Sequence, residues 1–310
     1  MSALRRGYVY GLSAYLLWGF FPLYFKLLQP AGPVEILAHR VVWSVVFVAL
    51  LLSAMRHWTF LRSLLRQPRA LGGATLAAAL IGANWFTYIY GVNADRVVET
   101  ALGYFINPLV VVLLGVGVLG ERLRTGQWIA LGVGGVAVVV LTVAYGRLPY
   151  ISLALALSFG GYSLVKKRLG LPAAEGLFVE SAVLAPAALG YLGWLIWRNE
   201  SAFGHVSATH TVLMLLAGAA TAIPLLLFAG AANRTPLTGL GILQYITPVM
   251  QLGIGVLVFH EPMPPARLAG FALVWLALII FTLDAIQHVR RSSRAAALPT
   301  APEPVSLKGR

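Results

Sequence analysis

An all-α membrane protein of ten transmembrane helices, arranged as two inverted five-helix repeats, is the fold that the sequence predicts. Three observations lead to it: an apolar composition, ten long apolar runs, and an internal repeat at an offset of 140 residues. Of the 310 residues, 59% are hydrophobic and 11% are charged, against about 25% charged in an average soluble domain. So few polar groups cannot coat a water-facing surface, so we expect the chain to lie in lipid.

Ten apolar runs supply the predicted spans, because a bilayer core about 30 Å thick requires roughly 20 apolar helical residues to cross it. In chain order they are residues 7–25, 41–55, 70–94, 100–120, 125–146, 148–165, 181–197, 211–233, 235–259 and 268–283. The second, seventh and tenth are short unless flanking residues join them. Their extension carries His39, Arg40, Glu180 and Asp284 into the membrane, so these four polar side chains require an explanation.

The internal repeat is clearest in two stretches, INPLVVVLLGVGVLGE at 106–121 and ITPVMQLGIGVLVFHE at 246–261. At the same offset, Lys26 corresponds to Lys166. Each unit holds five spans, an odd number, so the second unit must be inverted relative to the first. Inverted repeats are typical of transporters that work by alternating access around a site near the membrane midplane.

The repeat divides the chain into three predicted parts. The first five-helix unit covers residues 1–146 and the second covers 147–288. Residues 289–310 form a basic tail that we expect to be disordered and cytoplasmic. Counted over alternate loops, 17 of the Lys and Arg residues lie on the side of the N-terminus and five on the other side. The positive-inside rule therefore places both termini in the cytoplasm.

The net charge of +13 follows mostly from this loop bias. It favours anionic lipid headgroups over nucleic acid as the partner of the basic residues. A small-molecule substrate and the lipid bilayer are the predicted partners, and the oligomeric state stays open, a monomer being compatible with the sequence. The sequence predicts no cofactor, no metal and no enzymatic activity. It contains no cysteine, and His260-Glu261 lacks the second histidine of an H-E-x-x-H zinc site.

Two glutamates close the repeated stretches and are expected at opposite faces of the membrane. Glu121 is expected near the cytoplasm and Glu261 outside. Two interpretations stay open for both: a gating role, or the anchoring of a loop by hydrogen bonds.

Pro108 and Pro248 are also paired by the repeat. A proline inside a helix leaves the carbonyl four residues earlier without its partner, which here concerns Tyr104 and Gln244. Free carbonyls in a membrane must face protein or water. We therefore predict paired hinges beside a polar cavity, and purely structural kinks are the alternative.

Arg40 is the strongest candidate for binding a ligand. An arginine at a helix centre costs about 2.5–3.5 kcal/mol on insertion scales, so it should face a cavity or a partner. Its planar fork suits a substrate carboxylate, and Trp43 could stack on it. Snorkelling to the headgroups is the alternative. Glu180 corresponds to Arg40 in the second unit and is a candidate proton site.

Polar and aromatic residues gather in the third predicted span. Asn84 and Tyr88 are four residues apart and share a helix face, beside Trp85. An amide and a phenol could bind a ligand there while the indole stacks on it, and an interfacial aromatic belt is the alternative. Further candidates for lining the same cavity are Tyr104, Asn107, Tyr162, Gln244 and Tyr245.

The chain resembles the RarD branch of the EamA family, in the drug/metabolite transporter superfamily. The stretches that carry the resemblance are, in order, GLSAYLLWGFFPLYFKLL, EILAHRVVWS, IGANWFTYIYGVN, ETALGYFINPLV, LGERL and LGILQYITPVM. The resemblance covers nearly the whole chain except the basic tail. It implies ten helices in an inverted repeat, a location in the inner (plasma) membrane, and export of small metabolites or drugs, with members associated with chloramphenicol resistance.

Together these observations predict an inner-membrane transporter that exports small amphiphilic metabolites, amino acids in the first place, by alternating access. Efflux of phenicol-like drugs such as chloramphenicol is the first alternative. A facilitative, channel-like permease is the second.

Overall fold

The structure is a computed structural model that describes residues 2–120 and 122–296. Every regular element in these residues is a helix, and they contain no strand. The elements of the first half are α1 (Ala3–Gly19), α2 (Phe21–Lys26), α3 (Pro33–Ala54), α4 (Thr59–Leu65), α5 (Pro68–Asn93), α6 (Val97–Leu119) and α7 (Thr125–Tyr145). Those of the second half are α8 (Tyr150–Leu169), α9 (Ala173–Trp197), α10 (Ala208–Ala232), α11 (Leu237–Leu243), α12 (Ile246–Gly253), the π-helical η1 (Ile254–Val258) and α13 (Pro265–Ala296).

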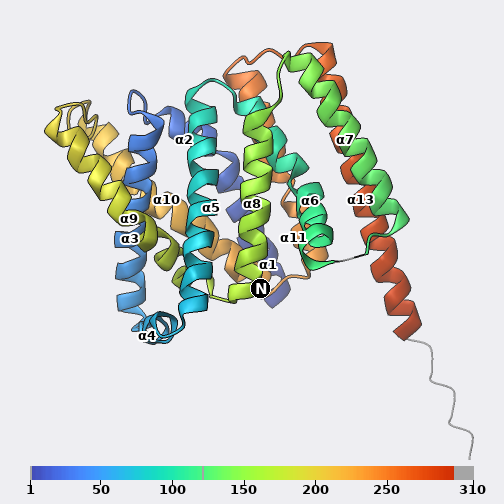
Figure 1. Cartoon of the computed structure of the whole chain (residues 1–310), viewed down its shortest axis with the longest axis horizontal. Coiled ribbons are helices and arrows are strands. Elements are labelled where there is room, and N and C mark those ends of the chain that lie inside the picture. Colours follow the sequence, from blue (N-terminus) through green and yellow to red (C-terminus); the bar gives the residue numbers. More distant parts are fainter. Residues whose placement is uncertain (1, 121, 297–310) are drawn as a thin grey trace, which may run out of the picture.

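The long helices run back and forth through one bundle (Figure 1). The start of α1, the short helix α4 and the end of α13 lie at one end of the bundle, which we call the terminal end. The opposite end, which we call the distal end, carries α2 and the connections α5–α6, α7–α8 and α9–α10. Helix α13 continues to Ala296, past the predicted boundary at 288, so the segment predicted to be a disordered tail begins as helix.

Eight segments are long and apolar enough to cross a membrane. They are Pro33–Ala54, Pro68–Asn93, Val97–Val118, Thr125–Tyr145, Ala173–Trp197, Ala208–Ala232, Gly239–Val258 and Pro265–His288. This confirms an all-helical, multi-pass membrane protein. The predicted spans at 7–25 and 148–165 correspond to α1–α2 and α8. They fall below this criterion because α1 ends after 17 residues and α8 carries three cations in its last turn.

Helix packing follows a regular pattern. α3 packs on α9 and α10, α5 on α8 and α9, α6 on α8 and α12, and α1 on α10 and α12. α7 and α13 pack on each other at one edge of the bundle (Figure 1). A close approach joins α10 to α3 at Gly218, where a Cβ atom would overlap the backbone of Trp43. Only glycine allows the two backbones to meet there.

The two proline-containing helices of the repeat differ in shape. α6 is one continuous helix with Pro108 inside it. Its counterpart is divided into α11, α12 and η1, and Pro248 lies in the first turn of α12 rather than in a helix interior. The break falls at Gln244 and Tyr245, and Gln244 is the residue whose carbonyl Pro248 leaves without a donor.

A second broken helix packs against this one. The helix is interrupted at Phe20, between α1 and α2, and Pro22 follows at the start of α2. Thr247 Oγ1 donates to the Tyr15 carbonyl at 2.8 Å, and Gln251 Nε2 donates to the Trp18 carbonyl at 3.1 Å. Side chains of one broken helix thus satisfy carbonyls near the end of the other, as buried polar backbone groups require.

Candidate functional site

Arg40 lies on α3 with only 5% of its surface exposed. Its Nε donates to Thr221 Oγ1 of α10 at 2.9 Å. The guanidinium carbon lies 4.2 Å from the ring centroid of Trp85 on α5. Phe21 and Phe25 of α2 lie at 5.6 and 5.5 Å on the same measure. Residues from four helices, α2, α3, α5 and α10, therefore come together around this cation.

No carboxylate neutralises Arg40 in the described part of the chain. The ion pairs formed there do not include it, and only its Nε has a hydrogen-bond partner. Burying an unpaired charge costs several kcal/mol, and aromatic faces recover only about 0.5–2 kcal/mol each. The two Nη groups have no hydrogen-bond partner among the described residues, and the N–H donors of a guanidinium suit an anion.

Trp43, which the sequence predicts as the stacking partner of Arg40, lies elsewhere. Its Nε1 donates to His39 Nδ1 at 3.2 Å, and its ring lies beside Phe203. Trp43 follows His39 by four residues, so the two side chains share a face of α3. Trp85 takes the stacking position instead.

A row of aromatic rings leads away from Arg40, and we call it the aromatic line: Phe25, Tyr88, Tyr104, Phe159 and Tyr162. Successive ring centroids lie 5.9, 5.7, 6.4 and 6.0 Å apart, within the range of favourable aromatic pairs. Three of the five rings were predicted as site residues. The buried hydroxyl of Tyr88 has no hydrogen-bond partner in the described residues.

The aromatic line ends at Glu180 of α9. Tyr162 donates its hydroxyl to Glu180 Oε2 at 3.1 Å, and Lys166 Nζ donates to Glu180 Oε1 at 2.5 Å. The carboxylate is buried but fully paired. The line thus joins Arg40 to the residue that corresponds to it in the second unit. A role of Glu180 as proton site stays a prediction.

The other predicted residues are placed as follows. Asn84 is buried, and its Nδ2 donates to the Leu155 carbonyl at 3.1 Å and to Ser158 Oγ at 3.2 Å, so its amide ties α5 to α8. Asn107, Gln244 and Tyr245 are half-buried. The Oδ1 of Asn107 has no partner in the described residues, whereas Tyr245 packs against the hydrophobic cluster between α6, α7 and α13.

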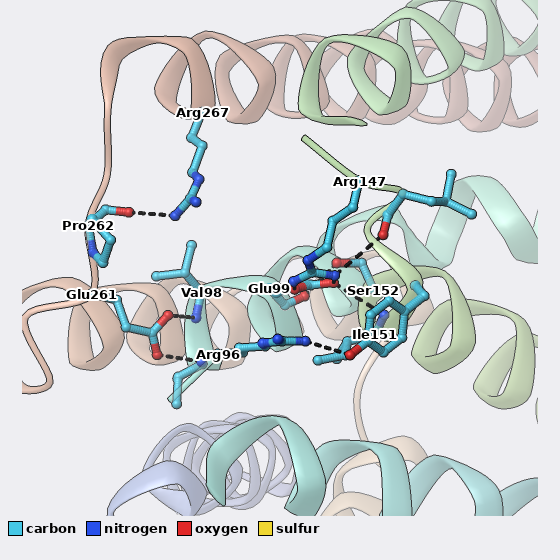
Figure 2. A network of polar contacts seen from close by, with 12 residues as sticks. Arg96, Val98, Glu99, Arg147, Ile151, Ser152, Glu261, Pro262 and Arg267 are labelled. Atoms are coloured by element: carbon cyan, nitrogen blue, oxygen red, sulfur yellow. Dashed lines mark hydrogen bonds and ion pairs between the residues drawn. The ribbon is translucent and has the colours of Figure 1, made fainter. Parts of the chain in front are cut away.

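Glu261 binds the beginning of α6. Its Oε1 accepts from the Val97 N–H at 2.5 Å and its Oε2 from the Val98 N–H at 2.9 Å (Figure 2). A carboxylate suits this position because the first N–H groups of a helix have no partner within it and carry partial positive charge. Burial raises the pKa of Glu261 above its ordinary value of 4.5, although the Val98 and Val97 N–H groups act to lower it. Glu121 lies outside the described residues.

Several contributors to the site carry no signal in the sequence. Thr221 is 181 positions from Arg40 along the chain, and nothing nearby marks it. Phe21 and Phe25 are indistinguishable from ordinary apolar residues in the sequence, and Lys166 falls just outside the predicted span at 148–165. Phe159 and Tyr162 are three residues apart, a spacing that places both on one helix face. That spacing is the one signal that could have identified Phe159.

The described helices form a multi-pass membrane protein with polar groups buried between them, and comparison with known proteins places it in a transporter family. A model of the EamA-like transporter family matches residues 5–143. The chain is 53% identical over 298 residues to Protein RarD of Streptomyces exfoliatus, covering 96% of this chain and 95% of that protein. It is 40% identical over 290 residues to Protein RarD of Escherichia coli (strain K12), covering 94% and 98%.

The chain belongs to the EamA family, and its similarity to RarD proteins extends over nearly its full length. A solved crystal structure of another protein superposes with a TM-score of 0.58 at 20% identity, covering 91% of this chain and 99% of that one. That likeness concerns the fold alone. As a member of a transporter family, the protein sits in lipid and binds a small molecule.

Proposed function

We propose that this protein exports small amphiphilic metabolites that carry a carboxylate, amino acids in the first place, across the inner (plasma) membrane by alternating access. The observation that carries this proposal is the Arg40 guanidinium, buried among aromatic rings and paired with no carboxylate in the described residues. A substrate carboxylate would complete its hydrogen bonds through two parallel N–H contacts. The rings beside it would hold the apolar part of the substrate.

The proposed architecture has ten membrane crossings in two inverted units, 1–146 and 147–288, with a cytoplasmic tail from 289. The packing pattern supports it. By the offset of 140 residues, α3 corresponds to α9 and α5 to α10, so the contact of α3 with α10 corresponds to that of α9 with α5. In the same way α1 corresponds to α8 and α6 to α11–α12–η1, so the contact of α1 with α12 corresponds to that of α8 with α6. All four contacts are present.

Alternating access requires the two units to hold different shapes at any one time. The broken helices α1–α2 and α11–α12–η1 are the counterparts of the continuous helices α8 and α6. Their difference supports an exchange in which one pair straightens as the other bends. We assign Pro108 and Pro248 as the hinges, with Glu261 and Glu121 acting at the ends of the hinge helices.

The orientation in the membrane has its own test. A reporter fused after Arg310 should lie in the cytoplasm, and one inserted between Arg198 and His210 should lie outside. Reporters on the same side would contradict the inverted repeat.

The substrate class is tested by transport into proteoliposomes. A panel of amino acids, their uncharged amides and chloramphenicol is assayed with and without a pH gradient. Arg40→Lys keeps the charge but loses the planar fork, so transport of carboxylate-bearing compounds should fall more than tenfold while uncharged compounds change little. An equal loss for both classes at normal protein levels would make Arg40 structural.

Efflux of phenicol-like drugs is the second candidate, and the aromatic line favours it because its five rings, in edge-to-face and tilted contact, offer a surface for an uncharged aromatic ring. Under this alternative, chloramphenicol is transported and Arg40→Lys leaves its rate unchanged. Transport down a gradient only, insensitive to the pH gradient, would indicate a facilitative permease.

A further inference from the structure

A charged cavity lies at the distal end of the bundle, and Arg40 is not part of its lining. It has a volume of about 210 Å³ and lies between the α5–α6 connection, the α7–α8 connection and the start of α13. Its lining includes Arg96, Glu99, Tyr145, Arg147 and Arg267. In Figure 2, Glu261 and Arg267 lie on one side of the network, and Glu99 with Arg147 on the other.

The carboxylates of this cavity already have partners. Glu99 accepts from Arg147 Nη2 at 2.7 Å and from the Ile151 N–H at 3.3 Å. Glu261 accepts from two N–H groups of α6, and Asp95 pairs with Lys26. None of the three needs a further cation.

Two arginines of the cavity, Arg96 and Arg267, have no carboxylate partner in the described residues. Arg96 Nη1 donates to the Tyr150 hydroxyl at 2.5 Å, and Arg267 Nη1 donates to the Pro262 carbonyl at 2.9 Å. Neither forms an ion pair within the described residues. The Nε of Arg267 is buried and has no partner there. A buried donor without an acceptor costs about 1–3 kcal/mol, so an arriving anion would gain from filling it.

The surroundings of Arg267 repeat those of Arg40. The guanidinium carbon of Arg267 lies 4.2 Å from the ring centroid of Tyr145, and that of Arg40 lies 4.2 Å from the ring centroid of Trp85. Both are arginines backed by an aromatic face, without a carboxylate partner in the described residues. An aromatic backing fixes the plane of the guanidinium and leaves its edge free for bidentate binding.

We propose that the distal cavity is a second anion-binding site, in which Arg96 and Arg267 hold the carboxylate of the transported molecule as it leaves or re-enters at the distal end. The cavity is smaller than the roughly 300–1,000 Å³ of sites for drug-sized ligands, so it fits a carboxylate end rather than a whole large molecule. That the anion is the carboxylate of the substrate rests on the proposed function. That the cavity binds an anion is independent of it.

The test uses the full chain, purified in detergent, with one reporter. Because the sequence has no cysteine, Leu148→Cys, at an exposed position beside Arg147, carries a single environment-sensitive fluorophore. Benzoate, acetate, inorganic phosphate and chloride are titrated separately. We expect saturable signals from benzoate and acetate, with the dissociation constant raised at least tenfold by Arg267→Gln and by Arg96→Gln.

Two controls separate this inference from the proposed function. Arg198→Gln removes an arginine outside the cavity, at the α9–α10 connection, where it pairs with Glu200 and lies over Trp194. This variant should leave the titration unchanged. Arg40→Gln should also leave the distal signal unchanged while reducing transport. If Arg40→Gln transports normally, the proposed function fails although the distal site stands.

Other outcomes overturn the assignment. Phosphate or chloride binding as tightly as benzoate would show a general site for inorganic anions and remove the role in substrate release. A signal that survives Arg267→Gln would place the anion elsewhere. If Arg267→Gln does not fold, Arg267→Lys serves in its place and should raise the dissociation constant several-fold; an unchanged constant would overturn the proposal.

Discussion

Arg40 on α3 and Glu180 on α9 are related by the sequence offset of 140 residues, but their surroundings differ. Glu180 has a lysine and a phenol as partners, whereas Arg40 has one threonine hydroxyl and three aromatic rings. Both are buried to a similar extent. Pairing rather than burial therefore distinguishes the charge that can bind a ligand from the charge that holds helices together.

The largest effect on transport is expected when Arg40 is given an ion-pair partner. Thr221→Asp places a carboxylate where the Arg40 Nε now meets a hydroxyl at 2.9 Å. The new ion pair should occupy the guanidinium and reduce transport of carboxylate-bearing substrates by at least a hundredfold, measured as initial rates in proteoliposomes. Thermal stability should hold or rise because a buried charge gains a partner.

The matched control is Thr221→Asn, which has nearly the same shape and no charge. Its transport should stay within a few-fold of the unmodified protein. Equal losses in the aspartate and asparagine variants would show that the shape of the pocket, rather than the free charge, is what matters.

The opposite change removes the ion-pair partner of Glu180, which is Lys166. Lys166→Met leaves Glu180 buried without its cation, which costs about 3–5 kcal/mol when a buried pair is broken. A marked fall in the unfolding temperature should follow. The double variant Lys166→Met with Glu180→Gln should recover most of it. A single variant as stable as the unmodified protein would mean that the pair is not a structural device.

Pro108 and Pro248 are the proposed hinges of the two halves. Pro108→Ala and Pro248→Ala each restore a backbone donor, so each should lower transport several-fold with stability unchanged or raised. In the proposed inverted arrangement, the two variants should favour opposite facings. Labelling of Gln244→Cys by an impermeant thiol reagent, applied from each side in turn, measures this. Shifts toward the same side would leave the prolines as static kinks.

The smallest expected effect is a pH dependence at Glu261. Its pKa is raised in this structure, and it should return toward 4.5 when the cap on α6 opens to water. The state with the raised pKa binds protons more tightly, so falling pH favours the capped state. Transport should therefore slow as the distal pH falls from above the raised pKa toward 4.5, and Glu261→Gln should abolish that change. A rate that rises over this window contradicts the assignment.

Much of the architecture follows from local signals. Run length and composition predict an all-helical membrane protein, and the short second and seventh runs predict that Arg40 and Glu180 are buried. Pairing could not be predicted, because Thr221 is 181 positions from Arg40 along the chain and Lys166 lies on a different helix from Glu180. Partners of this kind are fixed by helix packing, which the sequence of one helix does not contain.

The stacking residue shows the same limit at short range. Trp43, three residues from Arg40, was predicted to stack on it, whereas Trp85 was predicted to stack on a ligand. His39, at four residues from Trp43, offers its indole an acceptor, and that hydrogen bond turns the ring away. For Glu261, anchoring by hydrogen bonds was one of two interpretations. The N–H groups that it binds belong to Val97 and Val98, 164 and 163 positions away, beyond the reach of any motif.

The central claim, that the free charge of Arg40 binds the substrate carboxylate, is tested most directly by a double-mutant cycle between protein and ligand. Dissociation constants are measured for an amino acid and for its carboxamide, with the unmodified protein and with Arg40→Gln. A direct contact predicts that the carboxylate is preferred at least tenfold by the unmodified protein, about 1.4 kcal/mol, and not at all by the variant. An equal preference in both proteins would contradict the account.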